Sequence, residues 1–281
     1  MKDVMPKVSV RRICRVLEVP RSAVARENAS SQATPTRRPP GAFLVERIRE
    51  LIKKHPTYGY RRLWALLRFR DGLLINKKAV YRILKAKKWF CHERRSTPRP
   101  RVKGRISIAS RSDERWAIDV THIHCGSDGW GHLAAVIDCH DREIVGYEFS
   151  LRGRAKEAER AVEEACLSRF GTLRPQGEVP VVRSDNGLVF QSRRFRAALR
   201  DYRLSQEFIT PYTPEQNGMI ERFFRSLKEE CVWQHNFRSF AEARRAIDRW
   251  IEHYNEERPH QGLGYLSPRQ YRERQQVQLV A

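Results

Sequence analysis

Three acidic residues lie at positions from which the folded chain could bring their carboxylates together. Asp119 lies inside the apolar, β-rich run "WAIDVTHI", Asp185 follows the run "VPVVRS", and Glu221 lies early in the helical run "MIERFFRSLKEEC". Hard divalent cations prefer such oxygen ligands. Two cations about 3.5 to 4 Å apart can activate an attacking oxygen and stabilise a leaving oxygen in phosphoryl transfer. The three residues are therefore candidates for a metal-dependent phosphoryl-transfer site.

Each of these acids also has an ordinary structural interpretation. A carboxylate inside an apolar strand is costly to bury unless it is paired or metal-bound, which favours a functional role for Asp119. Asp185 could simply belong to the common Asp-Asn-Gly turn, in which Asn186 and Gly187 are expected to shape the backbone. Glu221 could be a solvated helical residue. The residue pattern by itself leaves these alternatives open.

The elements that must position these acids follow an α/β order. Strand-like runs alternate apolar residues with period two, and helical runs repeat them with a period near 3.6. The strands are expected at 115–125, 132–140, 143–150, 179–186 and 204–210, with helices at 154–170 and 192–202. Three sequential strands followed by alternating helix and strand predict an RNase H-like core, a mixed five-stranded sheet flanked by helices.

The region before this core is expected to hold two small helical units. Apolar spacing in residues 8–26 predicts two short helices about a tight turn, a helix-turn-helix with Arg21 and Arg26 on its second helix. A second all-α unit is expected over residues 42–90, with Asn76 as the N-cap of its last helix. On that helix one surface is predicted to face a DNA groove; its residues are Lys77, Lys78, Tyr81, Arg82 and Lys85.

The positive charge is confined to this first part of the chain. The net charge is +22, and residues 1–112 hold 30 Lys and Arg against 7 Asp and Glu, while the rest holds 25 against 26. Neutralising phosphates with basic side chains releases counterions and drives binding to nucleic acid. The segregation therefore predicts a DNA-binding N-terminal part joined to a neutral globular domain.

The composition also bounds the compartment and the redox chemistry. No run reaches the roughly 18 apolar residues of a membrane span, and the basic N-terminus lacks the apolar segment of a signal peptide. The six cysteines are scattered without a C-x-x-C pair, so they are expected to be reduced packing thiols. His122, His124 and Cys125 lie close in sequence but are not expected to converge on a metal.

Other acidic residues compete with the three candidates. Asp128, Asp138 and Asp141 flank predicted turns, where aspartate commonly caps its own backbone. Glu229 and Glu230 are expected to be solvated on the outer side of the helix that carries Glu221. We therefore leave all five outside the predicted metal site.

The motifs around the three acids resemble those of a known family. The residues around the three acids, "WAIDVTH", "SDNG" with Phe190 close behind, and "PYTPEQNGMIERFFRSLKEE", are similar to the signatures of DDE transposases and integrases. Within these, the chain resembles the second-frame (OrfB) product of the IS-three group of bacterial insertion sequences. "HPTYGYRRLWALL" and "HYNEERPHQGLGYLSPRQY" match the same group, and 35 residues separate the second aspartate from the glutamate.

The resemblance implies a catalytic triad and its chemistry. Asp119, Asp185 and Glu221 would hold two Mg²⁺ ions, or Mn²⁺, and the enzyme would free a 3′-OH at the end of the element and join it to another phosphate. Lys228, two helical turns after Glu221, would bind a terminal DNA phosphate. The His/Cys zinc module of retroviral integrases is missing from the sequence, so zinc is not expected.

The resemblance also implies partners and a division of the chain. We expect double-stranded DNA as terminal inverted repeats and target, a homo-oligomer on that DNA, and a frameshift fusion to an upstream-frame product, in the bacterial cytoplasm at the nucleoid. A catalytically silent DNA-binding relative is the alternative. The expected division is a helix-turn-helix at 1–27, a linker at 28–41, a helical DNA-binding domain at 42–90, a basic linker at 91–112, an RNase H-like core at 113–260 and a C-terminal tail at 261–281.

The loop before Glu221 has two interpretations. Thr213 and Gln216 could form a capping box that starts the helix at once. The family resemblance favours a mobile loop with Gly218 as hinge and a helix that begins near Met219. Both place Glu221 early in the helix.

Overall fold

The computed structural model describes residues 14–16, 18, 41–91, 109–210 and 213–280. Arg21, Arg26 and nearly all of the expected first helix-turn-helix and both linkers lie outside these residues. The described part of Ile48–Ala281 groups into one compact unit. Among the described helices, none is long and apolar enough to cross a membrane.

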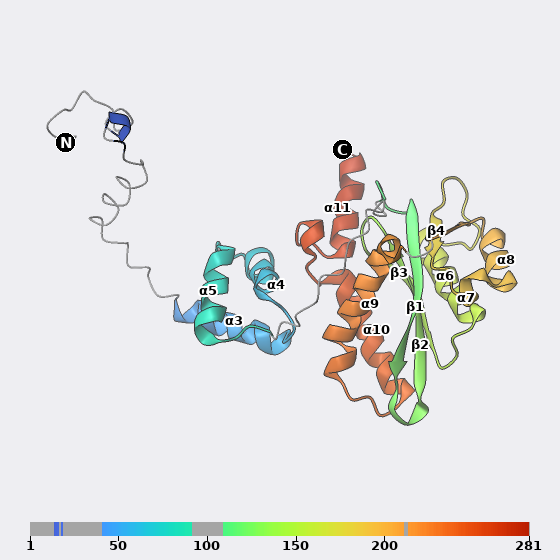
Figure 1. Ribbon diagram of the computed structural model, residues 1–281, viewed down its shortest axis with the longest axis horizontal. Helices are drawn as coiled ribbons and strands as arrows, with labels where there is room; N and C mark the ends of the chain where they lie inside the picture. The colour runs from blue at the N-terminus through green and yellow to red at the C-terminus, as the bar shows by residue number, and fades with distance from the viewer. Residues whose placement is uncertain (1–13, 17, 19–40, 92–108, 211–212, 281) are drawn as a thin grey trace. The chain divides into compact units, whose positions relative to one another are not determined.

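A mixed five-stranded sheet forms the centre of the molecule, as predicted (Figure 1). Its strands are β1 (Arg115–His124), β2 (Trp130–Asp138), β3 (Ile144–Ser150), β4 (Val181–Ser184) and β5 (Ser205–Phe208). Their order is β3-β2-β1-β4-β5, with the first three antiparallel and β1, β4 and β5 parallel. Parallel neighbours need long crossovers, and these are supplied by the helices between β3 and β4 and between β4 and β5.

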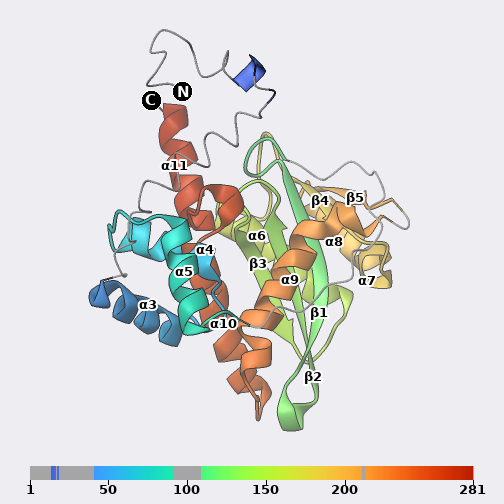
Figure 2. The same cartoon turned by 60° about the vertical axis from the view of Figure 1, so that its left-hand side comes forward.

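Helices cover both faces of the sheet (Figures 1 and 2). On one face lie α6 (Ala155–Phe170), α7 (Leu188–Gln191) and α8 (Arg193–Asp201), and on the other lie α9 (Gly218–Glu230), α10 (Phe240–Glu256) and α11 (Pro268–Val280). Trp116 and Ile118 of β1 belong to the core under α6 and α8, whereas Ala117 belongs to the core under α9 and α10. The predicted alternation along β1 is thus confirmed, and it turns Asp119 toward the α9 side.

The second helical unit also has the expected elements. It contains α3 (Ala42–Lys54), α4 (Tyr60–Ala65), the π-helix η1 (Leu66–Arg70) and α5 (Lys77–Lys87). The side chain of Asn76 accepts a hydrogen bond from the Lys78 backbone N–H at 2.9 Å, which confirms it as the N-cap of α5. Short 3₁₀ turns lie elsewhere in the chain, at η2 (Gly126–Asp128), η3 (Pro214–Asn217), η4 (Val232–Gln234) and η5 (Gln261–Leu263).

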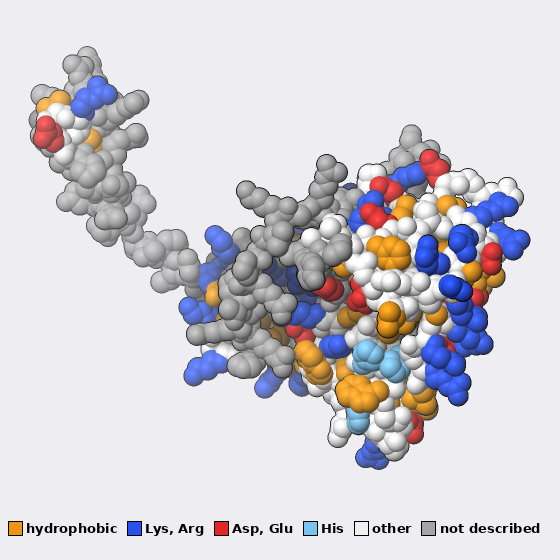
Figure 3. All heavy atoms as spheres, turned by 45° about the vertical axis from the view of Figure 1, so that its right-hand side comes forward, with side chains coloured by type: hydrophobic (Ala, Val, Ile, Leu, Met, Phe, Trp, Pro, Cys, Tyr) orange, Lys and Arg blue, Asp and Glu red, His pale blue; other side chains and the backbone are white. Residues whose placement is uncertain are grey.

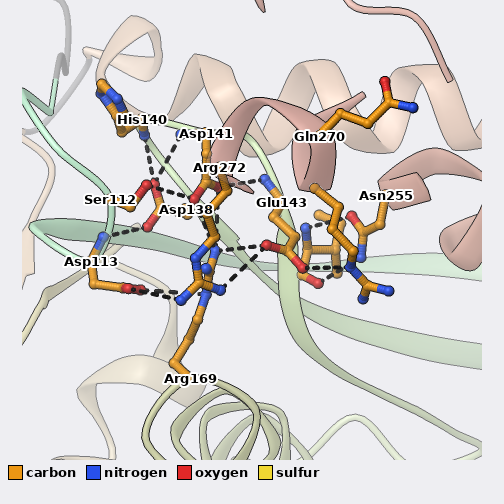
Figure 4. A network of polar contacts seen from close by, with 12 residues as sticks. Ser112, Asp113, Asp138, His140, Asp141, Glu143, Arg169, Asn255, Gln270 and Arg272 are labelled. Carbon is orange, nitrogen blue, oxygen red and sulfur yellow. Dashed lines mark hydrogen bonds and ion pairs between the residues drawn. The ribbon is translucent and has the colours of Figure 1, made fainter. Parts of the chain in front are cut away.

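A buried charge network joins α6 to the turn between β2 and β3 (Figure 4). The Arg169 side chain at the end of α6 is fully buried and lies 3.1 Å from both Asp141 and Glu143 and 3.4 Å from Asp113. Leaving any of these charges unpaired in the interior would be strongly destabilising. The network therefore fixes where α6 ends against the sheet.

The same network reaches the C-terminal helix. Arg272 of α11 lies 3.6 Å from both Asp113 and Glu143, and Arg269 lies 3.5 Å from Glu143. Residues 261–281, expected as a tail, thus carry η5 and a helix that is ion-paired to the core.

The turn aspartates have partners that sequence reasoning only partly foresaw. Asp138 accepts hydrogen bonds from the backbone N–H groups of His140 and Asp141, as predicted for a turn. Its burial and the nearby charge of Asp141 raise its pKa. Asp128 differs from the prediction, because it accepts from the distant Phe240 backbone N–H at 2.8 Å and so ties the β1–β2 connection to α10.

Candidate active site

Asp119 occupies the middle of β1, opposite Ala135 of β2. Its Oδ1 accepts a hydrogen bond from the backbone N–H of Val120 at 2.7 Å. Burial, together with the charges of Asp185 and Glu221, raises the pKa of Asp119 to about 7, although the hydrogen bond from Val120 and the charge of Lys228 act in the opposite direction. All three side chains predicted to join it therefore act electrostatically on this carboxyl group.

Asp185 directly follows β4, the parallel neighbour of β1. The register pairs Ala117 with Arg183, so two residues further along both strands Asp185 comes beside Asp119. Its Oδ1 accepts from the backbone N–H of Gly187 at 2.9 Å. A Cβ atom at position 187 would lie 2.8 Å from that oxygen, so the glycine leaves room for the carboxylate.

Asn186 holds the same turn from the other side. Its Nδ2 donates to the carbonyl oxygen of Ile209 at 3.1 Å, and its own carbonyl accepts from the Gln191 side chain at 2.6 Å. The prediction that Asn186 and Gly187 shape the turn is confirmed. The turn thereby holds Asp185 between the end of β4 and the residue that follows β5.

Glu221 and Lys228 extend from α9. The helix buries Ile220, Phe223 and Leu227 against the sheet and leaves Glu221, in its first turn, exposed. Seven residues later Lys228 is half-buried. Residues seven apart lie on one face of a helix, in agreement with the influence of both side chains on Asp119.

The loop before α9 does not form the capping box. Gln216 instead clamps Thr210: its Oε1 accepts from the Thr210 backbone N–H at 2.8 Å, and its Nε2 donates to the Thr210 hydroxyl at 3.2 Å. The helix begins at Gly218, one residue before the start that the family resemblance favours. The capping-box interpretation of Thr213 and Gln216 is therefore wrong.

Arg183 is a residue that sequence reasoning missed. It is buried on β4, two residues before Asp185, and its Nη2 lies 2.9 Å and 3.0 Å from the two carboxylate oxygens of Glu207 on β5. Its Nη1 donates to the carbonyl oxygen of Gln216 at 3.2 Å. One side chain thus connects the strand that leads to Asp185 with the turn that leads to Glu221. An arginine inside the apolar run "VPVVRS" was the available signal.

Most of the predicted DNA-binding residues on α5 are exposed. Lys78, Tyr81, Arg82 and Lys85 are accessible, whereas Lys77 turns toward aromatic rings. Its Nζ lies 4.4 Å from the ring centroid of Trp64 and 4.7 Å from that of Tyr265. DNA contact by these five residues stays a prediction, and the exposed four are the better placed.

Exposed rings gather where β1 and β2 meet their connecting turn. The ring of His124 lies edge-on to Trp130 with centroids 5.3 Å apart, and His122 lies edge-on to His132 at 4.7 Å. Figure 3 shows histidine side chains beside exposed hydrophobic ones, with Lys and Arg gathered along one edge of the same face. Cys125 is buried and donates to the carbonyl of Ile123, so its thiol does not join these histidines.

The prediction for the end of α9 is half wrong. The side chain of Glu229 is 41% exposed and paired with Arg225 at 2.8 Å, as expected for a solvated residue. Glu230 is buried and paired with Arg62 and Arg258 at 2.8 Å and 2.6 Å. Although burial raises it, hydrogen bonds and charge from Arg258 and Arg62 bring the pKa of Glu230 below its ordinary value.

The donor set suits a hard cation, although the side chains are not gathered around one point. Within the described residues, no group of three or more His, Cys, Asp and Glu side chains stands ready to hold a metal ion. Three carboxylates repel one another, and the raised pKa of Asp119 expresses that repulsion together with burial. A divalent cation would supply the positive charge that this set lacks.

Comparisons with known proteins agree with this geometry. Residues 109–214 and 202–268 match family models described as integrase core domains, and residues 42–96 match an HTH-like domain. The chain is 32% identical over 232 residues to the transposase InsD for insertion element IS2A/D/F/H/I/K of Escherichia coli, covering 80% of this chain and 76% of that protein. It is equally similar to the InsD transposase for element IS2-9 of strain K12, of which it covers 75%.

A solved structure supports the fold. A chain of the simian T-cell lymphotropic virus intasome, determined with the PP2A regulatory subunit B56 gamma, aligns with a TM-score of 0.50 and 17% identity, over 80% of this chain and 74% of that one. The two integrase-core matches together span Asp119, Asp185, Glu221 and Lys228.

Proposed function

The chain belongs to the DDE transposases of the IS-three group of bacterial insertion sequences, and we propose that Asp119, Asp185 and Glu221 are its catalytic triad. Enzymes of this class cleave DNA and transfer strands. The observation that carries the assignment is the half-buried Asp119 carboxyl group in the middle of β1, on which Asp185, Glu221 and Lys228 all act electrostatically. A strand-borne acid with a raised pKa beside two further acids is typical of a site that awaits a cation.

Integrase cores of this class use divalent metal ions, and we propose two Mg²⁺ ions, replaceable by Mn²⁺, held by the triad. Such ions lower the pKa of the attacking oxygen and stabilise the leaving oxygen. The chain's own residues prepare the site. Asp119 must release its proton, the Gly187 backbone N–H orients Asp185, and α9 presents Glu221. Lys228 offers an ammonium group for a phosphate at the end of the DNA.

The N-terminal part supplies DNA recognition in this proposal. The HTH-like match covers the expected helical domain at 42–90, and we propose that it and residues 1–27 bind the terminal inverted repeats while residues 113–260 carry out catalysis. The enzyme would act as a homo-oligomer on element and target DNA at the nucleoid, as a fusion with an upstream-frame product.

A strand-joining assay tests the triad. Purified protein is given oligonucleotides that carry the terminal repeats, with Mg²⁺ or Mn²⁺, and 3′-end joining is followed on sequencing gels. Asp119→Asn, Asp185→Asn and Glu221→Gln should each abolish joining while end binding persists. Glu229→Gln, a matched change on the same helix at a side chain that is 41% exposed, should leave joining intact.

Two results would contradict the proposal in different ways. Robust joining by any triad variant would remove that residue from the catalytic site. Specific end binding by the wild-type protein and its fusion without any joining would instead support the catalytically silent binder.

A further inference from the structure

Two sequence signatures far apart in the chain contact each other. We define the helical module as residues 48–91; it carries "HPTYGYRRLWALL". The other signature, "HYNEERPHQGLGYLSPRQY", runs from the last turn of α10 into the start of α11. The Tyr58 hydroxyl is hydrogen-bonded to Nε2 of His253 at 2.9 Å. The ring of His55 stacks on Tyr58 at 4.5 Å and on His253 at 5.3 Å. Burial lowers the pKa of both histidines, so this stack is neutral near pH 7.

The centre of the contact is the carboxylate of Glu230. Arg62 of the module donates to its Oε1 at 2.8 Å, and Arg258 donates to both oxygens at 2.6 and 2.8 Å. Arg258 also donates to the Ser226 hydroxyl at 3.3 Å. The side chains of Glu230 and Arg258 are only 7% and 3% exposed. Removing one partner from such a group leaves a buried charge uncompensated, so the arrangement selects one relative position of its parts.

Aromatic and peripheral contacts extend the same surface. The Lys77 ammonium lies between the rings of Trp64 and Tyr265, and those two rings meet edge-on with centroids 5.2 Å apart. At the rim, Arg61 donates to Gln261 and Arg70 to Glu257, each at 3.2 Å. The contact thus has a buried ionic centre, an aromatic flank and a polar rim, as a specific interface does.

Glu230 ties this interface to the catalytic helix. It lies in the last turn of α9, nine residues after Glu221, which is about 14 Å along a helix that rises 1.5 Å per residue. Because α9 is one continuous helix that packs in the core through Ile220, Phe223 and Leu227, Glu221 and Glu230 keep a fixed separation. Any group bound to the module is thereby held at a set distance from Glu221.

We propose that the surface formed by Glu230, His253, Arg258 and Tyr265 is the docking site of the chain's own helical module, and that this docking sets the register between the DNA bound by the module and the active site. The inference rests on the proposed function, because it assumes that the module binds the terminal repeat. It adds that the position of the cut is set by the Arg62–Glu230 contact.

The test compares Arg62→Ala with Arg68→Ala, which removes the same charge from the same module. Arg62→Ala should bind the terminal repeat within about twofold of wild type. It should join at least about tenfold more slowly, since small misplacements of reacting groups are costly, and its cuts should spread over neighbouring phosphates. Arg62→Lys should restore much of the precision, and Arg68→Ala should match wild type.

A second variant guards against misfolding. Tyr58→Phe keeps the ring stack and loses only the hydroxyl bonded to His253, so it should show the same loss of cutting precision to a lesser degree. Small-angle scattering without DNA should give a larger radius of gyration for Arg62→Ala combined with Tyr58→Phe than for wild type.

The outcomes separate this inference from the proposed function. If the folded wild type joins ends and both variants cut the same phosphate at the wild-type rate, the register role is wrong. An unchanged radius of gyration in the double variant would overturn the docking itself. If the wild type does not join ends at all, the proposed function fails, and the scattering result still decides whether the module docks.

Discussion

The metal-free protein should be destabilised by Asp119, the first aspartate of the proposed catalytic triad. Burial and two neighbouring acids raise the pKa of Asp119 from its ordinary 3.8 to about 7. Between these values the folded protein keeps a proton that the unfolded chain has released, so stability falls as pH rises through this window. Asp119→Asn removes the titration and can still accept the hydrogen bond from the Val120 N–H.

The size of the effect follows from the two pKa values. One pKa unit corresponds to about 1.4 kcal/mol, so the shift of Asp119 is equivalent to about 4 kcal/mol once the folded protein is fully ionised. Between pH 5 and pH 7, where only part of the shift is sampled, the stability gained by Asp119→Asn over wild type should grow by about 2 kcal/mol. Below pH 4 the two proteins should differ little on this account.

Urea unfolding of wild type and Asp119→Asn in EDTA at pH 5, 6, 7 and 8 measures this difference directly. The gap should widen from pH 5 to 7 and level off above it. Mg²⁺ should then stabilise the wild type at pH 8 and have little effect on Asp119→Asn, because bound metal replaces the missing positive charge. A stability difference that is independent of pH would refute the electrostatic account of the site.

Three further predictions concern other parts of the chain. Gly187→Ala places a Cβ atom 2.8 Å from the Asp185 carboxylate. Strand joining should therefore fall at least about tenfold while end binding stays intact. Full joining activity would show that the glycine is not needed to make room for Asp185. Lys78→Ala with Arg82→Ala should lower the slope of log affinity against log salt by about 2 in a filter-binding titration; an unchanged slope would remove α5 from the DNA interface. Arg169→Ala should lower the free energy of unfolding in urea by about 3 to 5 kcal/mol. The control Arg160→Ala, at an exposed ion pair, should lower it by less than about 1 kcal/mol. Similar losses for the two variants would show that the buried network contributes no more than a surface pair.

The layers of the fold were predictable because they depend on periodicity. Alternation in "WAIDVTHI" assigned Ala117 and Ile118 to opposite faces of the sheet, and the two hydrophobic cores confirm it. The N-cap Asn76 and the helix in residues 154–170 were also predictable, because helix caps and amphipathic spacing depend on residues close together in the sequence. The mixed five-stranded sheet was predicted from the order of strands and helices along the chain, because few topologies remain once parallel crossovers are needed. The order of the strands within the sheet came only from the structure.

The partners of buried charges were not predictable. Glu230 follows Glu229 on a helix, and nothing local distinguishes the buried acid from the solvated one. The difference arises from Arg62, 168 residues earlier, and from Arg258, 28 residues later. Arg183 was hidden in the same way, although an arginine in an apolar strand raises the same question as Asp119 does.

Compensation of charge distinguishes the structural acids Glu207 and Glu230 from Asp119, the acid proposed to be catalytic. Glu230 and Glu207 each accept hydrogen bonds from arginines, and although burial acts against them, both have a lowered pKa. At Asp119 the balance is reversed: burial and the charges of two nearby acids raise its pKa, and the charged group that lowers it is Lys228. An arginine partner for Asp119, like the one that Glu207 has, would compensate its charge but would also occupy the position of a bound cation. The expected loss of stability at Asp119 is therefore consistent with the proposal that this carboxylate is left without an arginine partner so that it can bind a metal ion.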